Sequence, residues 1–180
     1  MPVCLFGYEK VKRREWKDAD AVHWVHKVSA LTHNHLRSQI ACGIYYFLVK
    51  AILDEEGTMQ ERLQKGIDKA NDFYRKDVRN MVQLAHYSRV FDMAAFSKVA
   101  CDEIKSTGYV VDSFEAAVWC LLNEASFEET ALRAVNLGND TDTVAAIACG
   151  LAGVFYGNDG IPKRWMIGPI EHARHIVSNM

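Results

Sequence analysis

The sequence lacks the cysteine pattern of a disulfide framework or of a zinc site. It contains five cysteines, an odd number, and no two of them stand at C-x-x-C spacing. Four of the five lie within apolar helical patterns, where a reduced thiol packs as a small hydrophobic side chain. This usage argues against a disulfide-rich secreted protein and against a cysteine-ligated zinc ion. It predicts a reducing compartment, with a cytoplasmic location as the default.

An excess of positive charge and a long hydrophobic run are also missing. The formal net charge is −2 over 180 residues, so no overall positive field attracts the chain to nucleic acid or to an anionic membrane. The longest apolar run, residues 40–53, is interrupted by Gly43 and Lys50 and is too short to cross a bilayer. Residues 1–7 are apolar but brief and carry no basic residue, so we expect no signal peptide. We therefore predict neither a nucleic-acid partner nor a membrane partner.

Proline is scarce, and all three prolines lie near the ends of the chain. Between them, apolar residues recur at helical spacing nearly everywhere, and the only candidate strand, Val110-Val111, is too short to matter. Asp112 or Ser113 is expected to cap one helix, and Ser126 with Glu129 matches a capping box for the next. We predict one compact all-α domain over residues 1–180, with helices near 19–31, 33–54, 59–76, 82–105, 113–122, 126–138, 140–156 and from 169 onward.

The segment richest in chemical groups is the turn Gly138-Asn139-Asp140-Thr141-Asp142-Thr143. Two carboxylates and two hydroxyls fall within four residues at the start of a predicted helix. Oxygen ligands of this kind suit a hard cation such as Mg²⁺, Ca²⁺ or Mn²⁺. Asp140 and Asp142 cannot share one face of a regular helix, because residues i and i+2 point about 200° apart. They can converge on one ion only in an irregular turn, which Gly138 permits.

The same turn has a simpler interpretation as a helix cap. Aspartate and threonine are favoured at the N-cap, and acids stabilise the first turn of a helix, where the dipole is positive. A cap needs one carboxylate, however, and this turn carries two. Spacing alone leaves both interpretations open.

Small residues dominate the helix that follows this turn. Glycine in the middle of a helix costs about 1 kcal/mol relative to alanine. We therefore interpret Gly150 and Gly153 as positions where another element packs closely against the helix.

The stretch AVNLGNDTDTVAAIACGLAGVFYGNDGIPKRW resembles the closing signature of the ADP-ribosylglycohydrolase family. In that family a GGDTDT turn opens a small-residue helix, and a Gly-rich turn and an Ile-Pro…Trp segment follow; here Asn139 replaces the second glycine. Residues 29–33 resemble the family's Thr-His element, and residues 108–113 resemble the element before the penultimate long helix. The resemblance extends over about residues 18–166.

The resemblance implies an all-α, compact multi-helix bundle of the ADP-ribosylglycohydrolase fold. It also implies hydrolysis of the glycosidic bond between ADP-ribose and a protein side chain or a small molecule, with Mg²⁺ or Mn²⁺ as cofactor. Asp140, Asp142 and Thr143 match the family's C-terminal metal ligands. His33 and Tyr109 match positions that contact the ADP-ribose-containing ligand. No catalytic residue is assigned.

Other parts of the family's site have no match in this sequence. It contains no adjacent Asp-Asp pair and no Gly-Asn-Gly loop, which in the family form the N-terminal acid cluster and the ribose-binding loop. We therefore expect an N-terminally truncated form of the fold, with no substantial hydrolase activity unless a second copy or a complementing chain supplies the missing acids. Two alternatives remain open: a non-catalytic helical module that binds ADP-ribose or a protein partner, and a structural role with Asp140 and Asp142 as caps.

Overall fold

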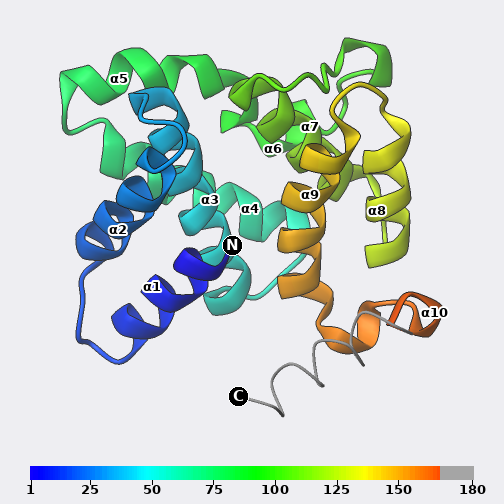
Figure 1. Ribbon diagram of the computed structural model, residues 1–180, viewed down its shortest axis with the longest axis horizontal. Helices are drawn as coiled ribbons and strands as arrows, with labels where there is room; N and C mark the ends of the chain where they lie inside the picture. The colour runs from blue at the N-terminus through cyan, green and yellow to red at the C-terminus, as the bar shows by residue number, and fades with distance from the viewer. Residues whose placement is uncertain (167–180) are drawn as a thin grey trace.

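The structure is a computed structural model that describes residues 1–166, and this part of the chain is built from helices without a strand (Figure 1). The all-α prediction is thus confirmed. The short helix expected from residue 169 lies outside the described residues. The elements are α1 (Pro2–Lys12), α2 (Asp18–Ala30), α3 (Leu36–Asp54), α4 (Met59–Tyr74), α5 (Val78–Leu84), η1 (Ala85–Phe91), α6 (Met93–Phe96), η2 (Cys101–Glu103), α7 (Val110–Asn123), α8 (Phe127–Asn136), α9 (Thr141–Tyr156), η3 (Asn158–Gly160) and α10 (Lys163–Met166), where η marks a 3₁₀ helix.

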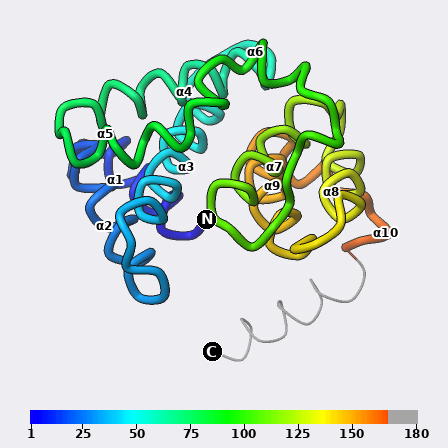
Figure 2. The backbone as a smooth tube through the Cα atoms, turned by 90° about the horizontal axis from the view of Figure 1, so that it is seen from above, coloured from blue at the N-terminus to red at the C-terminus, as the bar shows by residue number. Residues whose placement is uncertain are grey.

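The long helix α3 lies at the centre of the arrangement. It packs against α1, α2 and α4 on one side and contacts α7 and α9 on the other, where α8 covers α7 and α9 (Figures 1 and 2). Among the described helices, α3 alone is long and apolar enough to cross a membrane, but 61% of its apolar window is buried within the protein. This burial is what a core helix shows, because such a helix is apolar on most of its faces.

Capping hydrogen bonds mark the starts of two of the predicted helices. The Thr58 hydroxyl accepts a hydrogen bond from the Glu61 backbone N–H (3.3 Å), and the Ser126 hydroxyl accepts one from the Glu129 N–H (3.1 Å). The Glu61 carboxylate in turn accepts a bond from the Thr58 N–H (2.8 Å). The pair of bonds is reciprocal at α4, whereas at α8 the Glu129 carboxylate accepts from the Ala125 N–H instead (3.2 Å). These bonds satisfy amide groups that a helix cannot pair internally, so they mark where α4 and α8 begin.

The predicted helix over residues 82–105 is wrong. The chain there forms η1, the short α6 and η2, with irregular segments between them. Asp92 is the reason for one break, because its carboxylate accepts a hydrogen bond from the Ala95 N–H (2.9 Å) and starts a new helix at Met93. Aspartate competes in this way with a continuous helix, a local effect that apolar periodicity does not reveal.

Two other helix starts differ from the prediction. We did not predict α1, although Pro2 at its first position is a known start signal. Helix α7 begins at Val110, so Asp112 and Ser113 lie inside its first turn and do not cap it. The Asp112 carboxylate accepts a bond from the Thr107 hydroxyl instead (2.7 Å), which ties the helix to the preceding loop.

The two glycines of α9 differ in their surroundings. A Cβ atom at Gly150 would lie 2.3 Å from the Tyr45 hydroxyl oxygen and 2.9 Å from the Met1 terminal methyl carbon, so close packing is confirmed there. At Gly153 the nearest described atom would be a Phe127 ring carbon at 3.8 Å, which is an ordinary contact. The close-packing interpretation is therefore wrong for Gly153.

A polar contact in the interior joins α2, α3 and α4. His26 Nε2 lies 2.7 Å from the hydroxyl oxygen of the fully buried Tyr74, and the two rings stack with centroids 5.8 Å apart. Gly43 faces this contact, and a Cβ atom there would stand 1.7 Å from the Tyr74 oxygen. The absence of a side chain at position 43 is what allows the pair to form.

This contact predicts a pH-dependent loss of stability. Burial lowers the pKa of His26 to about 4, with the nearby His23 as a smaller cause. Between that value and the ordinary pKa of about 6.5, the unfolded chain binds more protons than the folded chain, so stability present above about pH 6.5 is lost as the pH falls toward 4. We expect urea unfolding from about pH 7 to pH 5 to show a loss of about 1–2 kcal/mol that the His26→Gln variant lacks. His23→Gln removes only the smaller cause and should keep most of the loss, and an unchanged pH dependence in His26→Gln would refute the assignment.

Candidate functional site

The Gly138–Thr143 turn owes its shape to two residues in the left-handed region of backbone space. Gly138 has φ +85° and Asn139 has φ +54°, a conformation that glycine and asparagine adopt more readily than other residues. The Asp140 N–H donates to the Ser106 carbonyl (3.0 Å), and the buried Ser106 hydroxyl donates to the Gly138 carbonyl (3.0 Å). These main-chain contacts hold the turn against the loop before α7 without using the aspartate side chains.

Asp140 occupies the N-cap position of α9, but its carboxylate makes no capping hydrogen bond. Within residues 1–166, neither Asp140 nor Asp142 has a side-chain hydrogen bond or an ion pair; the pairs present there involve other acids. The geometry therefore does not support the interpretation of these two aspartates as side-chain caps. It leaves the Asp140 carboxylate oxygens available to a ligand.

A cleft of about 750 Å³ lies in front of this turn. Four of the five residues singled out from the sequence line it, namely His33, Tyr109, Asp140 and Thr143. Three separate stretches bring them together: the α2–α3 connection, the start of α7 and the start of α9. The fifth residue, Asp142, is exposed and is not among the lining residues.

The Asp140 carboxylate lies close to the main chain of Gly108. A Cβ atom at position 108 would stand 3.2 Å from Asp140 Oδ2, and the carboxylate would be its only described neighbour within 4 Å. Thr143 lies one turn further along α9 and is exposed. Asp140 and Thr143 thus present a carboxylate and a hydroxyl to the same cleft.

The Thr-His element and an arginine that the sequence did not single out also line the cleft. His33 Nδ1 lies 3.0 Å from the Thr32 hydroxyl oxygen, and both residues are exposed to the cleft. The Arg37 guanidinium donates to the Tyr109 hydroxyl oxygen (2.6 Å). The sequence did contain a sign that Arg37 belongs to the site. Arg37 stands four residues after His33 and is a charged residue in the first turn of a largely apolar helix.

The donor chemistry of the turn fits a hard divalent cation, although the set is small. Carboxylate and hydroxyl oxygens are the ligands that Mg²⁺ accepts, and it needs about six of them in octahedral order. Among the described residues no group of three or more histidine, cysteine or acidic side chains is placed to hold a metal ion. Asp140, Asp142 and Thr143 would therefore supply only part of a coordination shell, with water completing the rest.

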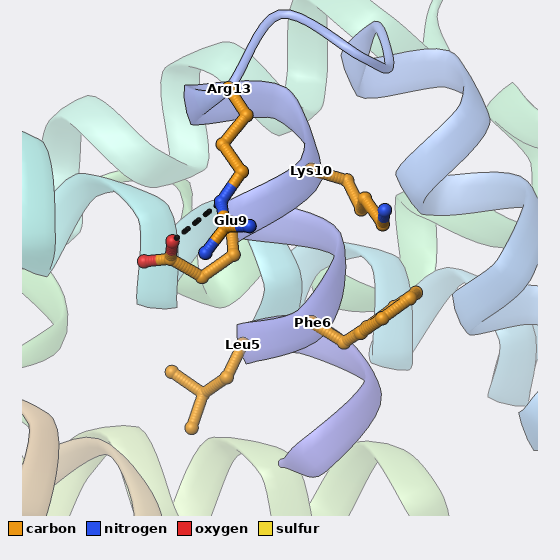
Figure 3. A pocket seen from close by; sticks show the side chains of 5 residues that line it. All are labelled: Leu5, Phe6, Glu9, Lys10 and Arg13. Atoms are coloured by element: carbon orange, nitrogen blue, oxygen red, sulfur yellow. Dashed lines mark ion pairs between the residues drawn. The ribbon is translucent and has the colours of Figure 1, made fainter.

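Cys149 and a second hollow, both within residues 1–166, are not part of this cleft. Burial raises the pKa of the Cys149 thiol on α9, which keeps it protonated and unsuited to act as a nucleophile. This second hollow, of about 400 Å³, lies on the outer face of α1 (Figure 3). There Arg13 pairs with Glu9 (3.7 Å), and none of the residues predicted from the sequence contributes.

The sequence is similar to a known family of proteins. The family model described as ADP-ribosylglycohydrolase matches residues 1–178. The chain is 44% identical over 79 residues to the ADP-ribosylarginine hydrolase Tri1 of Serratia proteamaculans. The aligned residues make up 44% of this chain and 21% of that protein. Its identity to Tri1 of Pseudomonas putida is 39% over 87 residues, covering 48% of this chain and 23% of the relative.

A longer match joins the chain to the ADP-ribosyl-[dinitrogen reductase] glycohydrolase of Rhodospirillum rubrum. The two are 28% identical over 148 residues, which cover 82% of this chain and 43% of that protein. The matched regions thus span less than half the length of each of these three relatives.

Proposed function

Because the chain belongs to the ADP-ribosylglycohydrolase family, we propose that its cleft binds ADP-ribose together with a divalent cation. The site would contribute to hydrolysis of the glycosidic bond between ADP-ribose and a protein side chain or a small molecule. One observation carries this proposal: the Asp140 carboxylate, without a partner in the described part of the chain, faces the cleft that His33 and Tyr109 also line.

In this proposal Asp140 and Thr143 hold Mg²⁺ or Mn²⁺ from within the cleft, and Asp142 contributes from its edge. The bound ion would act as a Lewis acid that orients the ribose and lowers the pKa of a water molecule for attack at the anomeric carbon. The residues of the chain supply negative charge and fix its position, because the turn is anchored to Ser106 through the main chain. The main chain of Asp140 is thereby held in place before a ligand arrives, and its carboxylate stays free of hydrogen bonds within the described residues.

The cleft also suits the organic part of the ligand. Its volume of about 750 Å³ falls within the usual range of small-molecule sites, about 300–1,000 Å³. Tyr109 exposes 43% of its surface and offers an aromatic face on which adenine would stack. His33, which also lines the cleft, would donate a hydrogen bond to the ligand.

We further propose that this chain alone binds better than it cleaves. The sequence holds no adjacent aspartate pair, and the described residues present no cluster of three acids or histidines. A second copy or a complementing chain would then supply the remaining donors. Two of the relatives are named as ADP-ribosylarginine hydrolases, so arginine-linked ADP-ribose is the first linkage to assay. A cytoplasmic location stays a prediction.

Titration calorimetry of the 180-residue protein with ADP-ribose tests the proposal. We expect binding in excess Mg²⁺ and its loss when EDTA removes the ion, because the Asp140 carboxylate would otherwise repel the anionic ligand. Binding that EDTA does not affect would favour the non-catalytic ADP-ribose module. No heat of binding under either condition would contradict both functions. Release of ADP-ribose from ADP-ribosylated arginine by the pure chain would overturn the view that it is incomplete.

A further inference from the structure

Arg37 is bonded through all three nitrogens of its guanidinium group. Nε donates to the Gln83 side-chain oxygen (3.0 Å), Nη1 donates to the Tyr109 hydroxyl oxygen (2.6 Å), and Nη2 lies 2.8 Å from His86 Nε2. These partners come from α5, η1 and the residue that precedes α7, whereas Arg37 itself lies in the first turn of α3. One side chain thus connects three segments of the chain at the wall of the cleft.

The main chain under Arg37 is also held firmly. The hydroxyl of the fully buried Tyr87 donates to the Arg37 carbonyl oxygen (2.9 Å). The fork of a guanidinium group is planar and rigid, so its three bonds fix the direction of each partner as well as the distance. Arg37 is therefore itself a fixed point from which another side chain can be oriented.

Tyr109 has little else to orient its ring. Its N–H donates to the Thr107 hydroxyl (3.1 Å) and its carbonyl accepts from the Ser113 N–H (3.0 Å), so its main chain is held. The residue is 43% exposed, and in the described part of the chain its hydroxyl has a hydrogen bond to Arg37 alone. The guanidinium carbon also lies 5.8 Å from the ring centroid, within the range of a cation–π contact.

We propose that Arg37 is a positioning residue that holds the Tyr109 ring in the orientation on which a nucleobase stacks in the cleft. The inference rests on the proposed function, because it presumes that the ligand carries a base. A ring held in its bound orientation loses less rotational freedom when the ligand binds, and the affinity rises accordingly. Arg37 need not touch the ligand to have this effect.

A double-mutant cycle between Arg37 and Tyr109 tests the proposal. We expect Arg37→Met and Tyr109→Phe each to weaken ADP-ribose binding in calorimetry by about tenfold, since each removes the same 2.6 Å bond. The double variant is expected to be weakened by about tenfold as well, rather than by the about hundredfold that independent effects would give. Arg37→Lys keeps a donor and should restore part of the affinity. Arg79→Met, an exposed arginine on α5, is the matched control and should bind as the wild type does.

Ring-labelled tyrosine NMR supplies a measurement that needs no ligand. We expect the Tyr109 ring signals to shift in Arg37→Met, because the ring loses the hydroxyl bond that fixes its place on the wall of the cleft, while those of the buried Tyr87 stay in place. If the wild type fails to bind ADP-ribose, the proposed function fails and the NMR result still decides the positioning role. Unchanged Tyr109 signals in Arg37→Met would overturn the proposal. Additive losses of affinity that shrink at high salt would also overturn it, because Arg37 would then act on the ligand by its charge.

Discussion

Asparagine in place of Asp140 is expected to abolish Mg²⁺-dependent binding of ADP-ribose, with an apparent affinity about 100-fold lower or more. The substitution keeps the size of the side chain but removes the negative charge that a hard cation needs from its ligand. The fold should not change, because the turn is held by the Asp140 N–H and the Gly138 carbonyl and not by the carboxylate. Calorimetry with Mg²⁺ and with EDTA measures the effect, and thermal unfolding checks that the stability stays near that of the wild type.

The chain offers matched comparisons for this experiment. Asp159 is exposed beyond the far end of α9, so Asp159→Asn should bind as the wild type does. Asp142 is exposed and lies outside the residues that line the cleft, so we expect Asp142→Asn to lose about tenfold rather than 100-fold. Retained Mg²⁺-dependent binding by Asp140→Asn would remove the observation that carries the proposed function.

Alanine in place of Gly43 is expected to produce the largest loss of stability, about 3–5 kcal/mol. The new Cβ atom would stand 1.7 Å from the Tyr74 hydroxyl oxygen and 2.9 Å from the ring carbon that bears it. Tyr74 is fully buried and packs edge-on against Phe73 at 5.1 Å, so its ring has no free space to enter. The substitution must therefore break the 2.7 Å contact with His26 or displace a helix. Thermal unfolding should show a melting temperature lower by about 10 °C.

Removing the clashing oxygen should restore part of this stability. In Gly43→Ala combined with Tyr74→Phe, the loss should be smaller than the sum of the two single losses, because the tightest overlap is gone. Gly153→Ala is the control, since its Cβ atom would make only an ordinary contact and alanine favours the helix by about 1 kcal/mol. Equal melting temperatures for Gly43→Ala and the wild type would show that α3 and α4 are not packed as described.

Local patterns predicted some helix starts and missed others, although the governing bonds lie within one turn in both cases. The capping residues Thr58 and Ser126 mark the starts of α4 and α8, because a side chain there bonds to an amide three residues away. Apolar spacing failed over residues 82–105, where Asp92 diverts the chain by a bond that periodicity does not detect. The same limit applies to α9, whose two glycines look alike in sequence and differ only in what packs against them.

The sequence by itself determined the helical class, the family signature and the acid-rich turn at residues 138–143. Each of these depends on residues that are neighbours along the chain, where bond geometry and spacing are already fixed. Only the tertiary structure decided that Asp140, His33 and Tyr109 line one cleft, that Asp142 is not among its lining residues, and that Arg37 bonds to Tyr109. Those relations join residues as far as 107 positions apart, and the packing of α3 against α7 and α9 sets them, because side chains so distant in sequence meet only when the helices between them are in place.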